Sequence, residues 1–226
     1  MLVWVSFLLA FTALLPLINP IGSALIFLGL VGDEPVEIYT QLSRKIAVAT
    51  IAFLLIIEFL GSLILNFFGI SLPIVQVTGG VIIAAIAWSL LFEKDAAANV
   101  RNKHQEIAQS DSLEVPDLAG KIFYPFTFPI TAGPGTLVVM LTLSARASNM
   151  KLADNIATHV GIALAVVALS VSVYFCYRYA PKLIRAVAPS TVHGILRVIA
   201  FFLMCIGVQI LWNGISLLSA SLANHK

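Results

Sequence analysis

Long segments almost free of charge dominate this sequence. Ten of its 24 Asp, Glu, Lys and Arg residues lie between Glu93 and Lys121, so few remain for the rest of the 226 residues. Hydrophobic residues make up 60% of the chain and charged residues 11%, which is typical of a protein that has lipid as its solvent. A helix of about 20 apolar residues crosses a bilayer core. Six segments are long enough to do so, at residues 4–31, 42–66, 71–92, 121–145, 156–178 and 193–218.

These segments are expected to be helices. In lipid, every backbone amide and carbonyl must find a partner within a helix or within a closed barrel. The segments are continuously apolar and do not alternate between apolar and polar residues as barrel strands do. We therefore predict an all-α integral membrane protein with six transmembrane helices. Residues 1–6 contain no Lys or Arg, so the first helix is expected to be retained and not removed as a signal peptide.

The basic residues predict the orientation of the helices. Cytoplasmic loops of membrane proteins are enriched in Lys and Arg. With six spans, ten of the 13 basic residues fall on the side of the first, third and fifth loops, and Arg146, Lys151 and Lys226 fall on the other side. Both termini are therefore expected to be non-cytoplasmic. This topology explains the net charge of +2, which gives no indication of nucleic-acid binding.

Two weak internal similarities predict a repeat. Residues 15–23 read LPLINPIGS and residues 128–136 read FPITAGPGT, with prolines followed by Gly-Ser in the first and Gly-Thr in the second. Residues 74–88 also align with residues 195–209 without gaps. Because each half would contain three helices, the second half would enter the membrane from the opposite side, giving an inverted-topology repeat. The predicted halves are residues 1–92 and 121–226, joined by a cytoplasmic connecting loop at residues 93–120.

Prolines predict that the first and fourth helices are broken near the middle of the membrane. A proline within a helix removes an amide hydrogen bond and clashes with the preceding turn. The first span contains Pro16 and Pro20, and the fourth contains Pro125, Pro129 and Pro134 beside two glycines. Unpaired backbone at this depth is tolerated only inside protein or beside a wet cavity.

Each break would start a new helix, at Pro20 with Asn19 as its cap and at Pro134 with Gly133 as its cap. Free amides at the positive end of a helix dipole suit a carboxylate. Glycines permit close approach of a ligand, and Asn, Ser and Thr supply neutral hydrogen-bonding groups. The predicted solute site comprises Asn19, Pro20, Gly22, Ser23, Thr131, Gly133, Pro134, Gly135 and Thr136. The alternative is that Pro and Gly only kink two packed helices, while Ser and Thr bond back to carbonyls of their own helices.

Glu58 lies in the otherwise apolar second span and is a candidate for proton or cation coupling. An interior hydrogen bond, or extension of the side chain toward the outer surface, is the alternative. His159 and His193 open the fifth and sixth spans and are interpreted as interfacial residues, not as metal ligands. Cys176 and Cys205 have no motif spacing and are interpreted as packing residues. No metal or cofactor is expected.

The motifs at residues 19–23 and 128–136, together with the glycine-rich third span, resemble the MarC family of bacterial and archaeal inner-membrane proteins. The resemblance covers essentially the whole chain and is most specific in the fourth span. It implies a six-helix protein of the bacterial or archaeal cytoplasmic (inner) membrane, similar to the small neutral amino acid transporters grouped with this family. The family name refers to multiple antibiotic resistance, and a name alone is a weak basis for assigning drug efflux.

The expected function is secondary transport of a small neutral amino acid or similar zwitterion, with a proton or a sodium ion as the coupling ion. The sequence lacks a phosphate-binding loop for ATP-driven transport. An enzyme would need paired carboxylates, a Ser–His pair or a His-x-x-x-His metal site at membrane depth, and the spans offer Glu58 alone. The alternatives are a channel-like or structural inner-membrane protein, or an exporter of other small compounds linked to antibiotic resistance.

Overall fold

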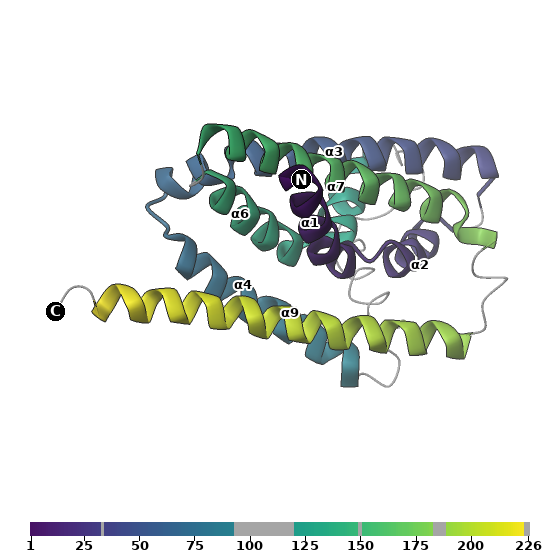
Figure 1. Cartoon of the computed structure of the whole chain (residues 1–226). Helices are drawn as coiled ribbons and strands as arrows, with labels where there is room; N and C mark the ends of the chain where they lie inside the picture. Colours follow the sequence, from purple (N-terminus) through teal and green to yellow (C-terminus); the bar gives the residue numbers. More distant parts are fainter. Residues whose placement is uncertain (33, 93–119, 149–150, 183–188, 224–226) are drawn as a thin grey trace.

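The computed structural model describes residues 1–32, 34–92, 120–148, 151–182 and 189–223, and the secondary-structure elements in this part of the chain are all helical (Figure 1). Most of the predicted connecting loop, residues 93–119, lies outside the described residues. The helices are α1 (Leu2–Ile18), α2 (Pro20–Val31), α3 (Val36–Phe67), α4 (Leu72–Phe92), η1 (Ile122–Thr131), α6 (Pro134–Ser148), α7 (Leu152–Arg178) and α9 (Pro189–Ala223). The predicted all-α class is confirmed.

Five helical segments among the described residues are long and apolar enough to cross a membrane, and there are six if the bent pair η1–α6 counts as one span. Helices α1 and α2 together make one of these segments, Leu2–Val31. The helices extend beyond the predicted apolar cores: α3 starts at Val36 and not at residue 42, and α7 starts at Leu152 and not at residue 156. Apolarity marks the part of a helix in lipid, whereas polar first turns continue the same helix into the interface.

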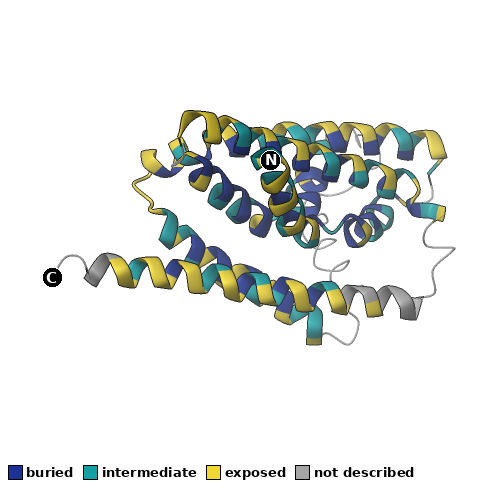
Figure 2. Ribbon diagram, viewed as in Figure 1, coloured by how far each residue is buried: buried dark blue, intermediate teal, exposed yellow. Residues whose placement is uncertain are grey.

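Two groups of helices are visible in Figure 1. Helices α4 and α9 pack against each other along much of their length and lie below the other helices in this view. The remaining helices form a bundle in which α7 packs against both α1 and α3, and α6 packs against α3 and α4. Buried residues concentrate on the facing sides of the bundle helices (Figure 2), while Trp88 and Trp212 are exposed on α4 and α9.

Glycines allow close contacts between helix backbones. A Cβ added to Gly80 of α4 would lie 2.5 Å from the backbone nitrogen of Leu211, and one added to Gly207 of α9 would lie 2.7 Å from that of Ala84. A Cβ on Gly161 of α7 would lie 2.5 Å from the carbonyl oxygen of Val3 in α1. Association in lipid gains little from the hydrophobic effect, so close backbone packing at small residues takes its place.

The chain changes direction between α1 and α2 at one residue. Asn19 has φ 42° and ψ 68°, in the left-handed region that asparagine occupies more readily than most residues. Its Oδ1 accepts a hydrogen bond from the Gly22 amide at 3.1 Å, and Pro20 occupies the first helical position. Asn19 therefore caps α2. Pro16, which was expected to contribute to the break, lies inside α1, which continues to Ile18.

The segment η1 is a widened helix with two non-helical residues. Tyr124 has φ −118° and ψ 126°, and Phe128 has φ −124° and ψ 126°. Each directly precedes a proline, Pro125 or Pro129, across a cis peptide bond. A proline disfavours the helical conformation of the residue before it, which accounts for both extended residues.

Threonine side chains complete the hydrogen bonding of η1. The Thr127 hydroxyl donates to the Ile122 carbonyl at 2.8 Å and the Thr131 hydroxyl donates to the Phe126 carbonyl at 2.7 Å. Helix α6 then starts at Pro134, at an angle of 75° to η1. The interruption falls at Ala132 and Gly133, between the two helical segments.

Replacing Gly207 with alanine should lower the stability of the α4–α9 pair, because the new Cβ would meet backbone atoms that cannot rotate away. Overpacking of this kind costs about 1–3 kcal/mol. The thermal unfolding temperature of the detergent-solubilised protein measures the effect. Gly194→Ala in the same helix is the matched control, because no atom lies within 4 Å of its added Cβ, and it should leave the unfolding temperature unchanged or raise it. Equal behaviour of both variants would contradict the close packing.

Candidate functional site

The structure brings the two proline-containing segments together. A Cβ added to Gly135, in the first turn of α6, would lie 2.9 Å from Leu17 Cδ2 of α1 and 3.1 Å from Ile83 Cγ1 of α4. Leu17 is two residues before Asn19. The last turn of α1 and the first turn of α6 are therefore in contact, with α4 beside them, although more than 100 residues separate them in the chain.

Tyr177 joins residues from both predicted segments. Its hydroxyl lies 2.8 Å from Thr131 Oγ1, and Ser23 of α2 also interacts with this hydroxyl. The Tyr177 ring is fully buried and stacks on Phe27, with ring centroids 4.4 Å apart and an interplanar angle of 14°. Tyr177 was not predicted as a site residue from the sequence. The available signal was a tyrosine near the end of an apolar span, and apolar spans commonly end in tyrosines.

Hydrogen bonds within the first turn of α2 engage most of its donors. The Gly22 amide donates to Asn19 Oδ1, and the amide and the hydroxyl of Ser23 both lie 2.9 Å from the Asn19 carbonyl oxygen. A Cβ on Gly22 would overlap the Asn19 side chain, with 2.2 Å to Nδ2, so the turn is also tightly packed. The bond from Ser23 to a carbonyl of its own turn matches the alternative to a solute-binding role for this residue.

The first turn of α6 differs from the first turn of α2, because the residue before it supplies no side-chain acceptor for its amides. Gly133 has no side chain that could cap the helix, and the Leu137 amide donates to the Gly133 carbonyl at 3.2 Å. The amides of Gly135 and Thr136 precede the point at which a helix supplies its own acceptors. Thr136 is 1% exposed, and its Oγ1 has no partner among the described residues.

Gly133 has fewer close neighbours than Gly22 or Gly135. A Cβ added to Gly133 would meet only the Pro129 carbonyl oxygen, at 3.1 Å. Gly133 is partly buried and Gly135 is buried, whereas Pro134 is exposed. The start of α6 therefore combines a positive helix end, available amides and an unpartnered buried hydroxyl, which is a suitable environment for an anionic group.

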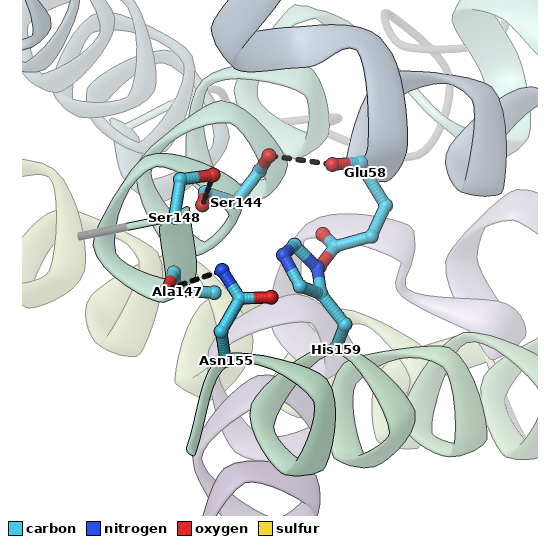
Figure 3. A network of polar contacts seen from close by, with 6 residues as sticks. All are labelled: Glu58, Ser144, Ala147, Ser148, Asn155 and His159. Carbon is cyan, nitrogen blue, oxygen red and sulfur yellow. Dashed lines mark hydrogen bonds and ion pairs between the residues drawn. The ribbon is translucent and has the colours of Figure 1, made fainter. Parts of the chain in front are cut away.

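A second polar cluster lies elsewhere in the bundle (Figure 3). Glu58 of α3 is 0% exposed, and its Oε1 lies 2.6 Å from His159 Nδ1 of α7. The Ser144 hydroxyl of α6 donates to the backbone carbonyl of Glu58. The side-chain Nδ2 of Asn155 donates to the Ala147 carbonyl at 3.0 Å, which connects α7 to the end of α6. Glu58 thus has an interior partner, and the interpretation of His159 as an interfacial residue misses the pair that it forms.

Two glutamines of the α4–α9 pair differ in their environments. Gln76 of α4 is buried and its Oε1 has no partner among the described residues, whereas Gln209 of α9 is exposed and donates to Asn213 Oδ1 at 3.0 Å. Cys176 and Cys205 are free thiols. Within the described ranges, no group of three His, Cys, Asp or Glu side chains is arranged to hold a metal ion.

Apolar helices of spanning length, with polar clusters buried between them, define a multi-pass integral membrane protein. The model of the MarC family integral membrane proteins matches residues 4–218, and the chain belongs to this family. It is 29% identical over 210 residues to the inner membrane protein MarC of Salmonella typhimurium (strain LT2), with 92% of each chain covered. The protein of the same name from Citrobacter koseri is 30% identical over 207 residues, again with 92% of each chain covered.

The inner membrane protein MarC of Escherichia coli O1:K1 is 29% identical over 207 residues, with the same coverage of both chains. No solved structure matches the chain. The names of these relatives and the apolar helices agree on the location: the chain is a multi-pass protein of the cytoplasmic (inner) membrane. These findings confirm the resemblance to the MarC family.

The Thr131–Tyr177 contact should be measurable as an energetic coupling. Tyr177→Phe should lower the free energy of unfolding by about 1 kcal/mol, because it removes one hydrogen-bonding group from a buried pair. In a double-mutant cycle with Thr131→Val, the two effects should differ from additivity by at least about 0.5 kcal/mol. Unfolding in detergent gives the values. The same cycle with Thr12→Val, whose hydroxyl bonds within its own helix, should be additive. Additivity in both cycles would contradict the contact.

Proposed function

We propose that this protein is a secondary carrier for a small neutral amino acid or a similar zwitterion, bound where α1 and α2 meet η1 and α6. The observation that supports it most directly is the first turn of α6. Its Thr136 hydroxyl is buried and has no partner in the part of the chain that the structure describes, and the amides of Gly135 and Thr136 lie at the positive end of the helix. A solute carboxylate would satisfy these donors, with about 1.5–3 kcal/mol for each charge-assisted hydrogen bond.

The surroundings of Gly133 support a zwitterion over a simple anion. The Pro129 carbonyl oxygen lies 3.1 Å from the position of an added Gly133 Cβ, so it is close to that glycine. A carbonyl oxygen accepts hydrogen bonds from an ammonium group. An amino acid would present its carboxylate to the amides of α6 and its ammonium to a carbonyl of η1, with both charges of the solute compensated in a buried place.

Residues 1–92 and 121–226 are proposed to be inverted repeats. A two-fold relation would exchange α1 with η1, α2 with α6, α3 with α7 and α4 with α9. The packing supports it: α1 and α2 both pack on α7, and η1 and α6 both pack on α3. In addition, α3 packs on α7 and α4 packs on α9, as helices next to the axis would. Movement of one repeat against the other would then open the site to alternate sides of the membrane.

Transport is proposed in preference to catalysis, and a carrier in preference to a channel. A channel-like or structural protein, or an exporter of other compounds linked to antibiotic resistance, would have the same apolar helices. Uptake and counterflow of labelled amino acids in proteoliposomes distinguish these functions. Saturable flux that unlabelled amino acids compete for indicates a carrier, whereas flux that never saturates indicates a channel.

Gly133→Ala should weaken binding of amino acids without unfolding the protein. The added Cβ would occupy the space beside the start of α6, where it meets little besides the Pro129 carbonyl oxygen. Loss of one charge-assisted hydrogen bond corresponds to roughly a tenfold to hundredfold lower affinity. Equilibrium binding of labelled amino acids to the purified protein, with thermal unfolding measured in parallel, checks both parts of the prediction.

Gly79→Ala in α4 is the matched control for this experiment. Its Cβ would lie 2.1 Å from Val138 Cγ1, so it should lower thermal stability through packing. Gly135→Ala is less informative, because its Cβ would also approach Leu17 and Ile83. If Gly133→Ala changes only stability, and the wild-type protein binds amines without a carboxylate as well as amino acids, the proposed site is wrong.

Two reporter fusions test the predicted orientation and the proposed inverted repeat together. A reporter fused after Lys226 should be active only in a periplasmic form, and a reporter inserted between residues 93 and 120 should be active only in a cytoplasmic form. The reason is the excess of Lys and Arg on the side of the connecting loop. Reversal of both results would overturn the orientation and leave the inversion intact. Both reporters on the same side would rule out an odd number of spans in the second half.

A further inference from the structure

The Glu58–His159 pair is separate from the proposed solute site. Ser144, which bonds to the Glu58 carbonyl, is ten residues beyond Pro134, or about 15 Å along α6 from the first turn of that helix. A solute bound at that turn therefore has no direct contact with the pair. A buried carboxylate within a membrane span is costly and calls for an explanation of its own.

The pair is arranged to hold one proton. Glu58 Oε1 lies 2.6 Å from His159 Nδ1, while Glu58 Oε2 has no partner among the described residues. With one proton shared between carboxylate and imidazole, the pair is neutral as a whole, either as carboxylate and imidazolium or as carboxylic acid and imidazole. Loss of that proton leaves one net negative charge in a low-dielectric interior, which is unfavourable.

His159 is the member of the pair that a proton can reach. Its side chain is 15% exposed, whereas that of Glu58 is fully buried. His159 is seven residues from the start of α7, or about 10 Å along the helix. The titratable groups at this end of the packed helices are Arg146 on α6, Lys151 and Asp154 on α7, and the amino group of α1, all of them exposed.

Buried hydroxyls continue from the pair toward the solute site. Helices α3 and α7 are antiparallel, because Glu58 late in α3 meets His159 early in α7 (Figure 3), and Phe27 contacts both Tyr39 early in α3 and Tyr177 late in α7. Ser170 is 11 residues from His159 and seven from Tyr177, which places all three on one face of α7.

Two buried hydroxyls at the α3–α7 interface lack partners among the described residues. Ser170 of α7 and Thr50 of α3 are fully buried, and the hydroxyl of each has no acceptor or donor among the described residues. Buried hydroxyls normally find a partner, and water between the helices would supply it. A hydrated path along the α3–α7 interface would connect the pair with the Thr131–Tyr177 contact beside the solute site.

We infer that Glu58 and His159 form the binding site of the coupling proton, an inference that rests on the proposed carrier function. A proton from the side predicted to be non-cytoplasmic binds His159 Nε2, and Nδ1 passes its proton to Glu58 Oε1. No other bond forms or breaks, and the reverse transfer releases the proton. A proton is inferred in preference to sodium, because Glu58 Oε1 lies 2.6 Å from an imidazole nitrogen and Oε2 has no hydrogen-bonding partner among the described residues.

The test combines transport with a direct measurement of proton binding. Wild type, Glu58→Gln, His159→Gln and Ser144→Ala are reconstituted into liposomes. Counterflow of labelled alanine measures solute exchange, and accumulation under an imposed proton or sodium gradient measures coupling. Infrared difference spectra of the solute-free protein across a pH titration report the carbonyl band of a protonated carboxylic acid. Ser144→Ala is the matched control, because it removes a neighbouring hydroxyl that does not titrate.

Glu58→Gln and His159→Gln should lose proton-driven accumulation and keep counterflow. Ser144→Ala should keep both, and the carboxylic acid band of the wild type should disappear in Glu58→Gln. The inference is overturned if Glu58→Gln still accumulates alanine under a proton gradient, or if sodium alone drives accumulation in the wild type. If Glu58→Gln does not fold, His159→Gln and the wild-type infrared titration decide the same question.

Absence of counterflow in the wild type, for alanine and for other neutral amino acids, has a different meaning. It would overturn the carrier function, and with it the coupling role of the pair. Counterflow that persists without any response to a proton gradient would overturn the proton site and leave the carrier function in place. The two failures are therefore distinguishable in a single preparation.

Discussion

Backbone groups that cannot pair along a helix must be buried in protein when the chain lies in lipid, and the bundle follows from this constraint. The chain meets it in two ways. At the start of α2, the Asn19 side chain and carbonyl engage the amides of Gly22 and Ser23. In η1, threonine hydroxyls bond to carbonyls five residues back, next to prolines that donate no amide. The first turn of α6 has the equivalent backbone bond, from the Leu137 amide to the Gly133 carbonyl, but no side-chain cap, and α1 and α4 pack against it. The difference between the two helix starts is the reason for placing the solute carboxylate at α6.

Helix α7 connects the polar parts of the bundle. One end of it holds His159 against Glu58, and the other end holds Tyr177 against Thr131. It also packs against α1 through Gly161, whose missing side chain lets the two backbones meet. A helix that touches both proposed sites is well placed to link proton binding to solute binding, because displacement of α7 against α3 would change both contacts at once. The variants of Glu58 and of Tyr177 therefore address two ends of one structural element.

The α4–α9 pair has a different character. Its contact depends on Gly80, Gly207 and Gly214, each of which faces backbone atoms of the partner helix. Its outer surface is apolar, with exposed Trp88 and Trp212. Helix α4 also reaches the bundle, where Gly79 faces Val138 and Ile83 faces Gly135. Through α4, the pair thus packs beside the start of α6. It contributes few of the polar groups that are proposed to act on a solute or a proton.

The sequence alone determined the features that depend on neighbouring residues. Apolar length predicted the spans and Asn-Pro predicted the cap of α2, because lipid solvation and backbone conformation act locally. The family resemblance rested on the same segments. Tertiary structure decided the partners: Glu58 meets His159 across 101 residues, and Thr131 meets Tyr177 across 46. It also decided that Ser23 bonds within its own turn while Thr136 does not. A sequence specifies which groups need a partner in a membrane, but the partner is chosen by how the helices pack, and that depends on contacts between segments far apart in the chain.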